Sequence, residues 1–173
     1  AMTMGTRIVV MKEGVIQQID TPTNLYDYPA NQFVAGFIGT PPMNFLDVQI
    51  HKGRGNAYQA ILPGATKESI GLGRISLKEA YASQKDFHAV LGIRSEDIHL
   101  STKEEGIAAR IRVVESLGSE CLLYLSLSNQ EDANEVNREI VMKIQGRCSY
   151  RNGDEIYILF DKQHIHLFDS DTG

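Results

Sequence analysis

The chain has 173 residues, of which 42% are hydrophobic and 23% are charged, a composition typical of a globular protein rather than a disordered one. Its formal net charge of −5 argues against a nucleic-acid partner, since such proteins usually carry a clustered basic face. No apolar run approaches the roughly 20 residues that a membrane helix needs. We therefore expect one folded domain, or one domain with a subdomain, large enough to hold a core.

The first part of the chain predicts a β-hairpin and then a short helix. Two β-rich runs, 7–11 and 15–19, flank Gly14, a residue suited to the positive φ of a tight turn. Thr21 is suited to cap a helix that begins at Pro22, because proline is favoured at the first helical position. A second proline seven residues later predicts that this helix is short.

A second short helix is expected from Asn31, its cap, through Ile38. One apolar face of this helix would carry Phe33, Val34, Phe37 and Ile38. Gly39 is suited to end the helix, and the Thr40-Pro41-Pro42 run cannot continue it. This pattern predicts a boundary between residues 1–42 and a domain formed by residues 43–173.

From residue 45 onward the chain predicts short strands separated by turns, so the fold class is mainly β. The expected strands are 45–51, 56–62, 87–94, 98–100, 107–117, 120–127, 139–145, 155–160 and 164–168. A short helix near 77–83, a turn at 95–97 and a polar loop at 128–138 interrupt them. Short strands at such spacing favour a small antiparallel barrel, for which we expect the five-stranded oligonucleotide/oligosaccharide-binding (OB) type.

Successive side chains of a β-strand point to opposite faces, and this alternation predicts which side chains of the two clearest strands face the core. In 107–117 the inward positions are Ile107, Ala109, Ile111 and Val113, and Arg110 and Arg112 point outward. In 120–127 the inward positions are Cys121, Leu123 and Leu125. Cys121 and Cys148 have no CxxC spacing, and we interpret them as reduced, buried and acting as small hydrophobes.

No residue of this chain is predicted to be catalytic or to bind a cofactor. The phosphate loop GxxxxGK[ST] does not occur, and neither does a GxSxG elbow. His164 and His166 fall on one side of a strand, a spacing that can hold a metal. Alternation assigns Ile165 and Leu167 to the core, however, which favours surface histidines and no metal site.

The sequence Arg7–Phe45 resembles one family closely, the ATP-binding subunits of maltose-type (carbohydrate-uptake) importers among the ABC transporters. Residues that match the family pattern include Ile8-Val9-Val10-Met11, Gly14, Pro22, Leu25-Tyr26, Pro29, Asn31, Phe33-Val34-Ala35, Phe37-Ile38-Gly39 and Met43-Asn44-Phe45. Leu91-Gly92-Ile93-Arg94 resembles the family's Gly-Ile-Arg-Pro-Glu motif, with Ser95 in place of the proline. Two further matches are the runs 113–120 and 166–169.

This resemblance implies that the chain is a C-terminal fragment. Residues 1–42 would end the nucleotide-binding domain, and 43–173 would form the accessory domain called TOBE. The family's phosphate loop, signature motif, catalytic glutamate and switch histidine would lie upstream of Ala1. ATP and magnesium would therefore belong to the complete protein, an ATPase that drives sugar uptake, and not to this chain.

The resemblance also implies partners and a location. In the family the accessory domains form a homodimer and receive regulatory signals, so a cytosolic regulatory protein is an expected partner, and a nucleic acid is not. The ATPase domain would contact the transmembrane permease subunits. The complete protein would be cytoplasmic and peripheral, at the inner face of the plasma membrane.

The expected hinge between the two parts is 40–45, and the candidate hinge or interface residues are Met43, Asn44, Phe45, Arg94 and Glu96. Residues 7–38 would show an exposed apolar patch, or a rearranged or disordered segment, without the rest of the ATPase domain.

An alternative function is a small-ligand sensor for an oxyanion or sugar within such an importer. Its candidate site is the Ser116-Leu117-Gly118-Ser119 run, where Ser116, Gly118 and Ser119 could offer hydroxyls and amides, although a plain hairpin turn is the favoured interpretation. A free-standing barrel that binds RNA or DNA is disfavoured by the charge.

Overall fold

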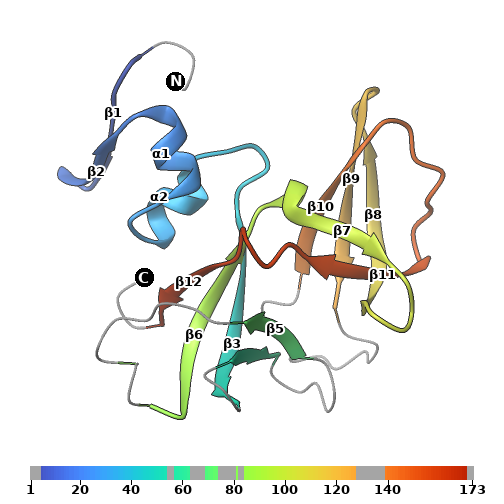
Figure 1. Cartoon of the computed structure of the whole chain (residues 1–173). Coiled ribbons are helices and arrows are strands. Elements are labelled where there is room, and N and C mark those ends of the chain that lie inside the picture. The colour runs from blue at the N-terminus through green and yellow to red at the C-terminus, as the bar shows by residue number, and fades with distance from the viewer. Residues whose placement is uncertain are drawn as a thin grey trace.

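The computed structural model describes residues 5–53, 57–62, 69–73, 81, 84–127 and 139–170. In Figure 1 a small lobe of one hairpin and two helices stands beside a larger body of β-strands, and a single connection runs between them. The expected helix near 77–83 (apart from Tyr81), the expected loop at 128–138 and residues 1–4 lie outside the described residues.

The hairpin of the small lobe confirms the sequence prediction. Strands β1 (Ile8–Lys12) and β2 (Val15–Asp20) pair antiparallel. The turn between them places Glu13 at φ 50° and Gly14 at φ 79°. Positive φ at both positions suits the right-handed twist of a tight hairpin, and glycine adopts it without steric strain.

Both helices begin at the predicted caps. In α1 (Pro22–Asp27) the Thr21 hydroxyl accepts a hydrogen bond from the Asn24 amide at 3.2 Å. In α2 (Gln32–Phe37) the Asn31 side chain accepts from the Val34 amide at 3.0 Å. The predicted apolar face of α2 is only partly correct, because Val34 and Ile38 are buried whereas Phe37 is 68% exposed.

The larger body contains two antiparallel sheets, each with five strands in the described residues. One has the order β10-β9-β8-β11-β7 and is formed by β7 (Ile98–Ser101), β8 (Ile107–Ser116), β9 (Glu120–Ser126), β10 (Glu139–Gln145) and β11 (Glu155–Phe160). The other has the order β12-β6-β3-β4-β5 and is formed by β3 (Asn44–Lys52), β4 (Tyr58–Ile61), β5 (Ser69–Gly73), β6 (Asp86–Ile93) and β12 (His166–Asp169).

The mainly β class is confirmed, but the strand order differs from the expected single five-stranded barrel. Over the residues that the structure describes, neither sheet closes on itself, and each keeps two edge strands. The inward side chains of both sheets instead share one core, which includes Leu46, Ile50 and Leu91 from one sheet and Leu125 and Ile158 from the other. Burying two sheet faces against each other replaces closure as the way to remove apolar surface from water.

A β-bulge in β8 overturns one predicted side-chain direction. The register between β8 and β9 shifts between Ile111 and Val113, so that Ile111 pairs with Leu125 and Val113 pairs with Tyr124. The extra residue, Arg112, turns Val113 outward, where it is 49% exposed. The inward positions expected for Cys121, Leu123 and Leu125 are confirmed, since all three are buried.

The expectation of reduced cysteines is wrong for this structure, in which Cys121 and Cys148 form a disulfide. Their spacing of 27 residues shows no motif, because β10 returns the chain beside β9 before Cys148 is reached. Contact between them is therefore a consequence of strand pairing that cannot be read from local sequence.

The small lobe exposes apolar side chains, as one of the two sequence-based alternatives expected. They are Val9, Met11, Val15, Ile16, Ile19, Tyr28 and Phe37. Behind them the lobe has its own small core of Val10, Leu25, Val34 and Ile38. In the described part of the chain no helix has the length and apolar character required to cross a membrane.

Candidate functional site

The candidate site is the junction at which the two helices meet the β-sheets, and Arg94 is at its centre. β6 ends at Ile93 and the short 3-10 helix η2 (Ser95–Asp97) follows, so Arg94 lies where the chain leaves the core. Its side chain is only 4% exposed. A charged side chain this deeply buried needs partners for its donors, because burying an unpaired charge is strongly unfavourable.

Arg94 finds these partners in the helical lobe. Its Nη1 donates to the main-chain oxygen of Ile38 at 2.8 Å, and its Nη2 donates to that of Tyr26 at 2.7 Å. The guanidinium carbon also lies 3.5 Å from the centre of the Tyr26 ring, in a cation–π contact. Burial lowers the pKa of Arg94, and the partial charges and carboxylates around it oppose that change. One side chain of the β body thus holds both helices.

Tyr26 connects this contact to Glu96. Its hydroxyl donates to Oε1 of Glu96, and the Ser95 hydroxyl donates to Oε2 at 3.0 Å. Burial would raise the pKa of Glu96, but the bonds from Tyr26, its own amide and Ser95 outweigh burial and lower it. Burial and the bond to Glu96 raise the pKa of Tyr26. The junction therefore holds an ionised carboxylate and a neutral phenol near neutral pH.

Gly39 allows Arg94 to approach the helical lobe. It has a φ of 116°, a conformation that side chains rarely adopt. A Cβ at Gly39 would lie 3.0 Å from Nη1 of Arg94 and 3.3 Å from the Tyr26 ring. The backbone conformation therefore favours glycine, and a larger residue would also have to displace the Arg94 and Tyr26 side chains slightly.

An apolar contact completes the junction on the side of α2. Met43 is buried with Ala35, Val90 and Phe168, and Phe45 packs against this group. The Phe45 and Phe168 rings meet edge to face with centroids 5.8 Å apart. Two glycines provide the space, because a Cβ at Gly36 would lie 3.2 Å from Phe45 and one at Gly92 would lie 2.6 Å from the Met43 sulfur.

Asn44 bonds the connection between the lobes to the sheet that contains β10. Its Nδ2 donates to the main-chain oxygen of Val141 at 2.9 Å, and its Oδ1 accepts from the Val141 amide at 2.7 Å. The Asn44 amide thus pairs with β10 as a neighbouring strand would. Because Asn44 is also the first residue of β3, it joins both sheets at the point where the chain enters the body.

The structure therefore brings together all five of the predicted hinge or interface residues: Met43, Asn44, Phe45, Arg94 and Glu96. The alternative ligand turn lies elsewhere. Ser116, Gly118 and Ser119 are exposed in the hairpin between β8 and β9, and the Ser119 oxygen accepts from the Gly146 amide at 2.7 Å. This geometry is that of a hairpin turn.

The two histidines of the sequence analysis do not act as a pair. Nδ1 of His164 lies 3.1 Å from Asp161 and 3.4 Å from Asp97. His166 is half-buried rather than at the surface, and its ring stacks on Phe168 with centroids 6.2 Å apart. Burial lowers the pKa of His166 and keeps it neutral.

Sequence reasoning missed several residues of the junction, namely Tyr26, Gly36, Gly39 and Gly92 as contact positions and Val141 as the partner of Asn44. Gly39 was expected to end the second helix, and Gly92 stands two residues before Arg94 in the motif used above, but neither pattern indicated a contact with the other lobe. Tyr26, Gly39 and Val141 depend on contacts across roughly 50 to 100 residues of sequence, which no local pattern records. Gly36 depends on the packing of Phe45, nine residues later, across the connection between helix and strand.

Comparisons with known proteins identify relatives of this chain. Residues 91–168 match the family model described as TOBE domain. The chain is 38% identical to the oligosaccharides import ATP-binding protein MsmX of Bacillus subtilis, over 99% of this chain and 45% of that protein. It is 32% identical to the sn-glycerol-3-phosphate import ATP-binding protein UgpC of Psychromonas ingrahamii, over 99% and 42%. The chain thus spans less than half the length of these curated relatives.

Proposed function

We propose that this chain is the regulatory and dimerisation region of an ATP-binding subunit of an ABC importer. It carries a TOBE domain and is homologous to the C-terminal region of such subunits. The imported substrate is a sugar, in line with the oligosaccharide named for one relative. The complete protein binds ATP and magnesium, hydrolyses ATP and works with permease subunits at the cytoplasmic face of the membrane. This chain supplies none of those catalytic groups.

The observation that carries the proposal is that the Arg94 side chain bonds to the main chain of both helical segments. The TOBE side contributes the guanidinium, and the helical lobe contributes the main-chain oxygens of Tyr26 and Ile38. The directional bonds of a buried guanidinium fix orientation as well as distance. A displacement of the TOBE domain is therefore transmitted to α1 and α2, which connect to the ATPase portion of the complete subunit.

A test of this coupling uses the complete subunit with its permease partners in proteoliposomes. Arg94→Lys keeps the charge but loses the two-pronged contact, so we expect sugar-stimulated ATP hydrolysis to fall several-fold. Arg112→Lys, at an exposed position of β8, is the matched control and should retain stimulation. Equal stimulation in both variants would contradict the coupling role. Uptake of glycerol 3-phosphate instead of an oligosaccharide would contradict the sugar assignment.

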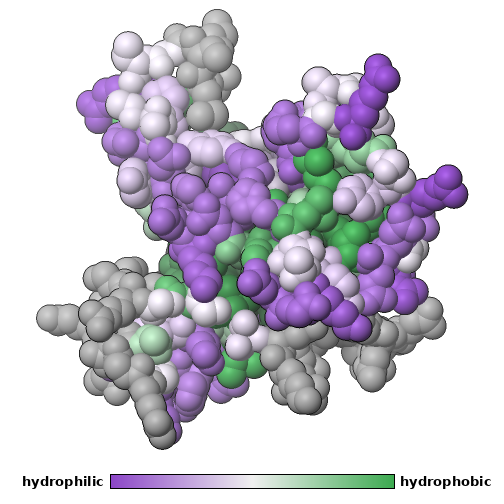
Figure 2. Space-filling view, turned by 45° about the vertical axis from the view of Figure 1, so that its right-hand side comes forward, coloured by the Kyte–Doolittle hydropathy of each residue, from purple (hydrophilic) through white to green (hydrophobic). Residues whose placement is uncertain are grey.

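For dimerisation we propose the outer face of the β10-β9-β8-β11-β7 sheet as the pairing surface. Figure 2 shows hydrophobic residues gathered on the side of the molecule that carries this sheet. Exposed apolar side chains there include Val113, Tyr124 and Leu159. A second copy of the same sheet would remove this surface from water, and such self-complementary contacts are the usual basis of twofold dimers.

Sedimentation equilibrium over a wide concentration range tests the pairing surface. We expect a monomer–dimer equilibrium that Val113→Lys and Leu159→Lys shift toward the monomer. Ile19→Lys is the matched control, because Ile19 is a similarly exposed apolar residue on β2 of the small lobe. A monomer at every concentration would show that the TOBE domain does not self-associate, and dissociation by Ile19→Lys alone would assign pairing to the small lobe.

A further inference from the structure

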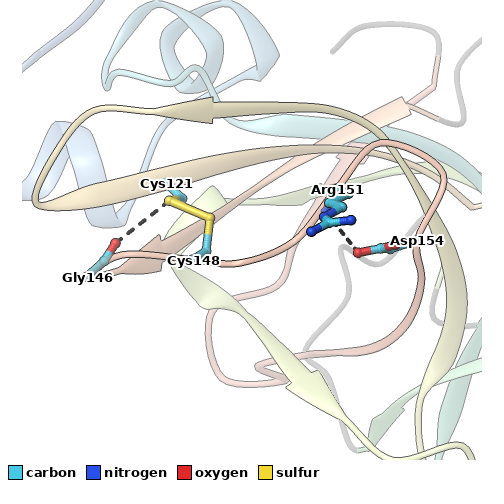
Figure 3. Close-up of a disulfide and its surroundings, with 5 residues drawn as sticks. All are labelled: Cys121, Gly146, Cys148, Arg151 and Asp154. Atoms are coloured by element: carbon cyan, nitrogen blue, oxygen red, sulfur yellow. Dashed lines mark hydrogen bonds between the residues drawn. A yellow bond between two sulfur atoms is a disulfide. The ribbon is translucent and has the colours of Figure 1, made fainter.

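The disulfide lies where two strands and a loop meet. Cys121 is the second residue of β9, and Cys148 follows the end of β10 by three residues. Figure 3 shows the bond joining the β9 strand to the segment that leaves β10, with Gly146 beside Cys121. The bond therefore holds the outgoing end of β10 against β9.

The same site offers a partner for the reduced form of Cys121. The Gly146 oxygen lies 3.8 Å from Sγ of Cys121, within reach of a weak S–H···O hydrogen bond. Gly146 is held independently of the disulfide, because its amide donates to the Ser119 oxygen at 2.7 Å. When the disulfide opens, the Cys121 thiol keeps an acceptor in place. Both the bonded and the dithiol states are thus accommodated.

The two cysteine residues differ in exposure. Cys121 is 1% exposed, whereas Cys148 is only partly buried. Thiol–disulfide exchange needs an incoming thiolate to reach one sulfur in line with the bond. Attack at Cys148 is the open route, and it releases the Cys121 sulfur toward the Gly146 oxygen.

We propose that Cys121 and Cys148 form a reversible thiol–disulfide switch that sets the stability of β10. A glutathione thiolate attacks Sγ of Cys148, the Cys121–Cys148 bond breaks, and Cys121 leaves as a thiolate that takes up a proton. A second glutathione attacks the mixed disulfide, which releases Cys148 as a thiol and gives oxidised glutathione. The protein gains two electrons and two protons, and two glutathione molecules are oxidised.

The switch has a route to the junction, because β10 is also the strand that Asn44 holds at Val141. Opening the bond removes the covalent link beside the outgoing end of β10, which lies four residues beyond Val141 at Gln145, and leaves hydrogen bonds alone to hold that end against β9. The reducing partner rests on the proposed function, since a subunit at the cytoplasmic face meets reduced glutathione, and cytosolic disulfides are usually transient or redox-sensing. The exchange chemistry can be measured whether or not the chain belongs to a sugar importer.

The experiment equilibrates the purified chain with mixtures of reduced and oxidised glutathione, traps thiols by alkylation and reads the two states by intact mass. Amide hydrogen exchange at Val141 and thermal unfolding are followed in parallel. We expect reversible interconversion within the cytosolic range of glutathione ratios, and a melting temperature about 10 °C lower in the dithiol form. Exchange at Val141 should become faster on reduction, while the amides of β3 and β6 keep their protection.

Cys148→Ser is the matched control, because it retains Cys121 and its acceptor but cannot form the bond. Its Val141 exchange should match that of the dithiol form and show no response to glutathione. A disulfide that remains intact in the most reducing mixture would be a purely structural disulfide and would overturn the proposal. Thiols that stay free in the most oxidising mixture would overturn it as well. Unchanged Val141 exchange during interconversion would reject the route to the junction.

Discussion

Replacing Arg94 by methionine tests most directly how the junction is held together. Methionine retains much of the apolar volume of the arginine stem but has no donors. The main-chain oxygens of Ile38 and Tyr26, which Arg94 bonds at 2.8 and 2.7 Å, would lose these bonds. We expect the variant to unfold more easily, and to release the helical lobe before the sheets.

The magnitude follows from the contacts. A hydrogen bond to a charged group contributes about 1.5 to 3 kcal/mol, and a desolvated cation–π contact contributes about 2 kcal/mol. Part of this loss is offset, because the variant no longer has to desolvate a charged guanidinium on folding. We therefore expect a net loss of about 3 kcal/mol in the free energy of unfolding.

The assay is urea denaturation followed by circular dichroism, with hydrogen exchange at the Leu25 and Ile38 amides as the local measure. Arg112→Met is the matched control and should change stability by no more than about 0.5 kcal/mol, since Arg112 is exposed on β8. A loss below about 0.5 kcal/mol for Arg94→Met, with the helical amides still protected, would refute the view that Arg94 holds the lobe.

Three further predictions concern neighbouring residues. Gly39→Ala should lower the free energy of unfolding by about 1 to 3 kcal/mol in urea denaturation, because of its φ of 116° and its closeness to Arg94; an unchanged midpoint would contradict this. Asn44→Ala leaves the Val141 amide without its partner, so its hydrogen exchange should accelerate while that of Leu123 does not. Glu96 has a lowered pKa, so its stabilisation is complete above the unfolded value of about 4.3 and is lost as pH falls through the lower folded value. Glu96→Gln should therefore flatten the acid side of the stability curve, and an identical acid midpoint would argue against this role.

Elements with local causes were predictable from the sequence. Thr21 and Asn31 cap their helices because a side-chain oxygen meets an amide three residues later, a contact that needs no tertiary partner. Gly14 turns the hairpin for a similarly local reason. The hinge candidates near residue 44 also lie at the junction, since the change from helix to strand occurs there.

Features that depend on strand pairing were not predictable in the same way. The bulge at Arg112 reverses Val113, because the register is decided by what β9 presents opposite it. The bond between Cys121 and Cys148 needs β10 to return beside β9, and the cation–π contact of Arg94 needs Tyr26 from 68 residues earlier in the chain. Two open sheets instead of a barrel result from similarly long-range choices of partner strand.

The two hydrogen bonds between the Asn44 side chain and the main chain of Val141 have a consequence for aggregation. Among the strands that the structure describes, β10 lies at the edge of its sheet, and an unpaired edge offers its amides and carbonyls to any other chain that can add a strand. The Asn44 amide occupies both main-chain groups of Val141 and so blocks strand addition at the middle of that edge. If the connection between the lobes moves away from the β-sheets, Asn44 no longer covers this edge, and the edge can pair with a strand of another molecule. The residue that positions the linker thereby also keeps neighbouring molecules from joining their sheets.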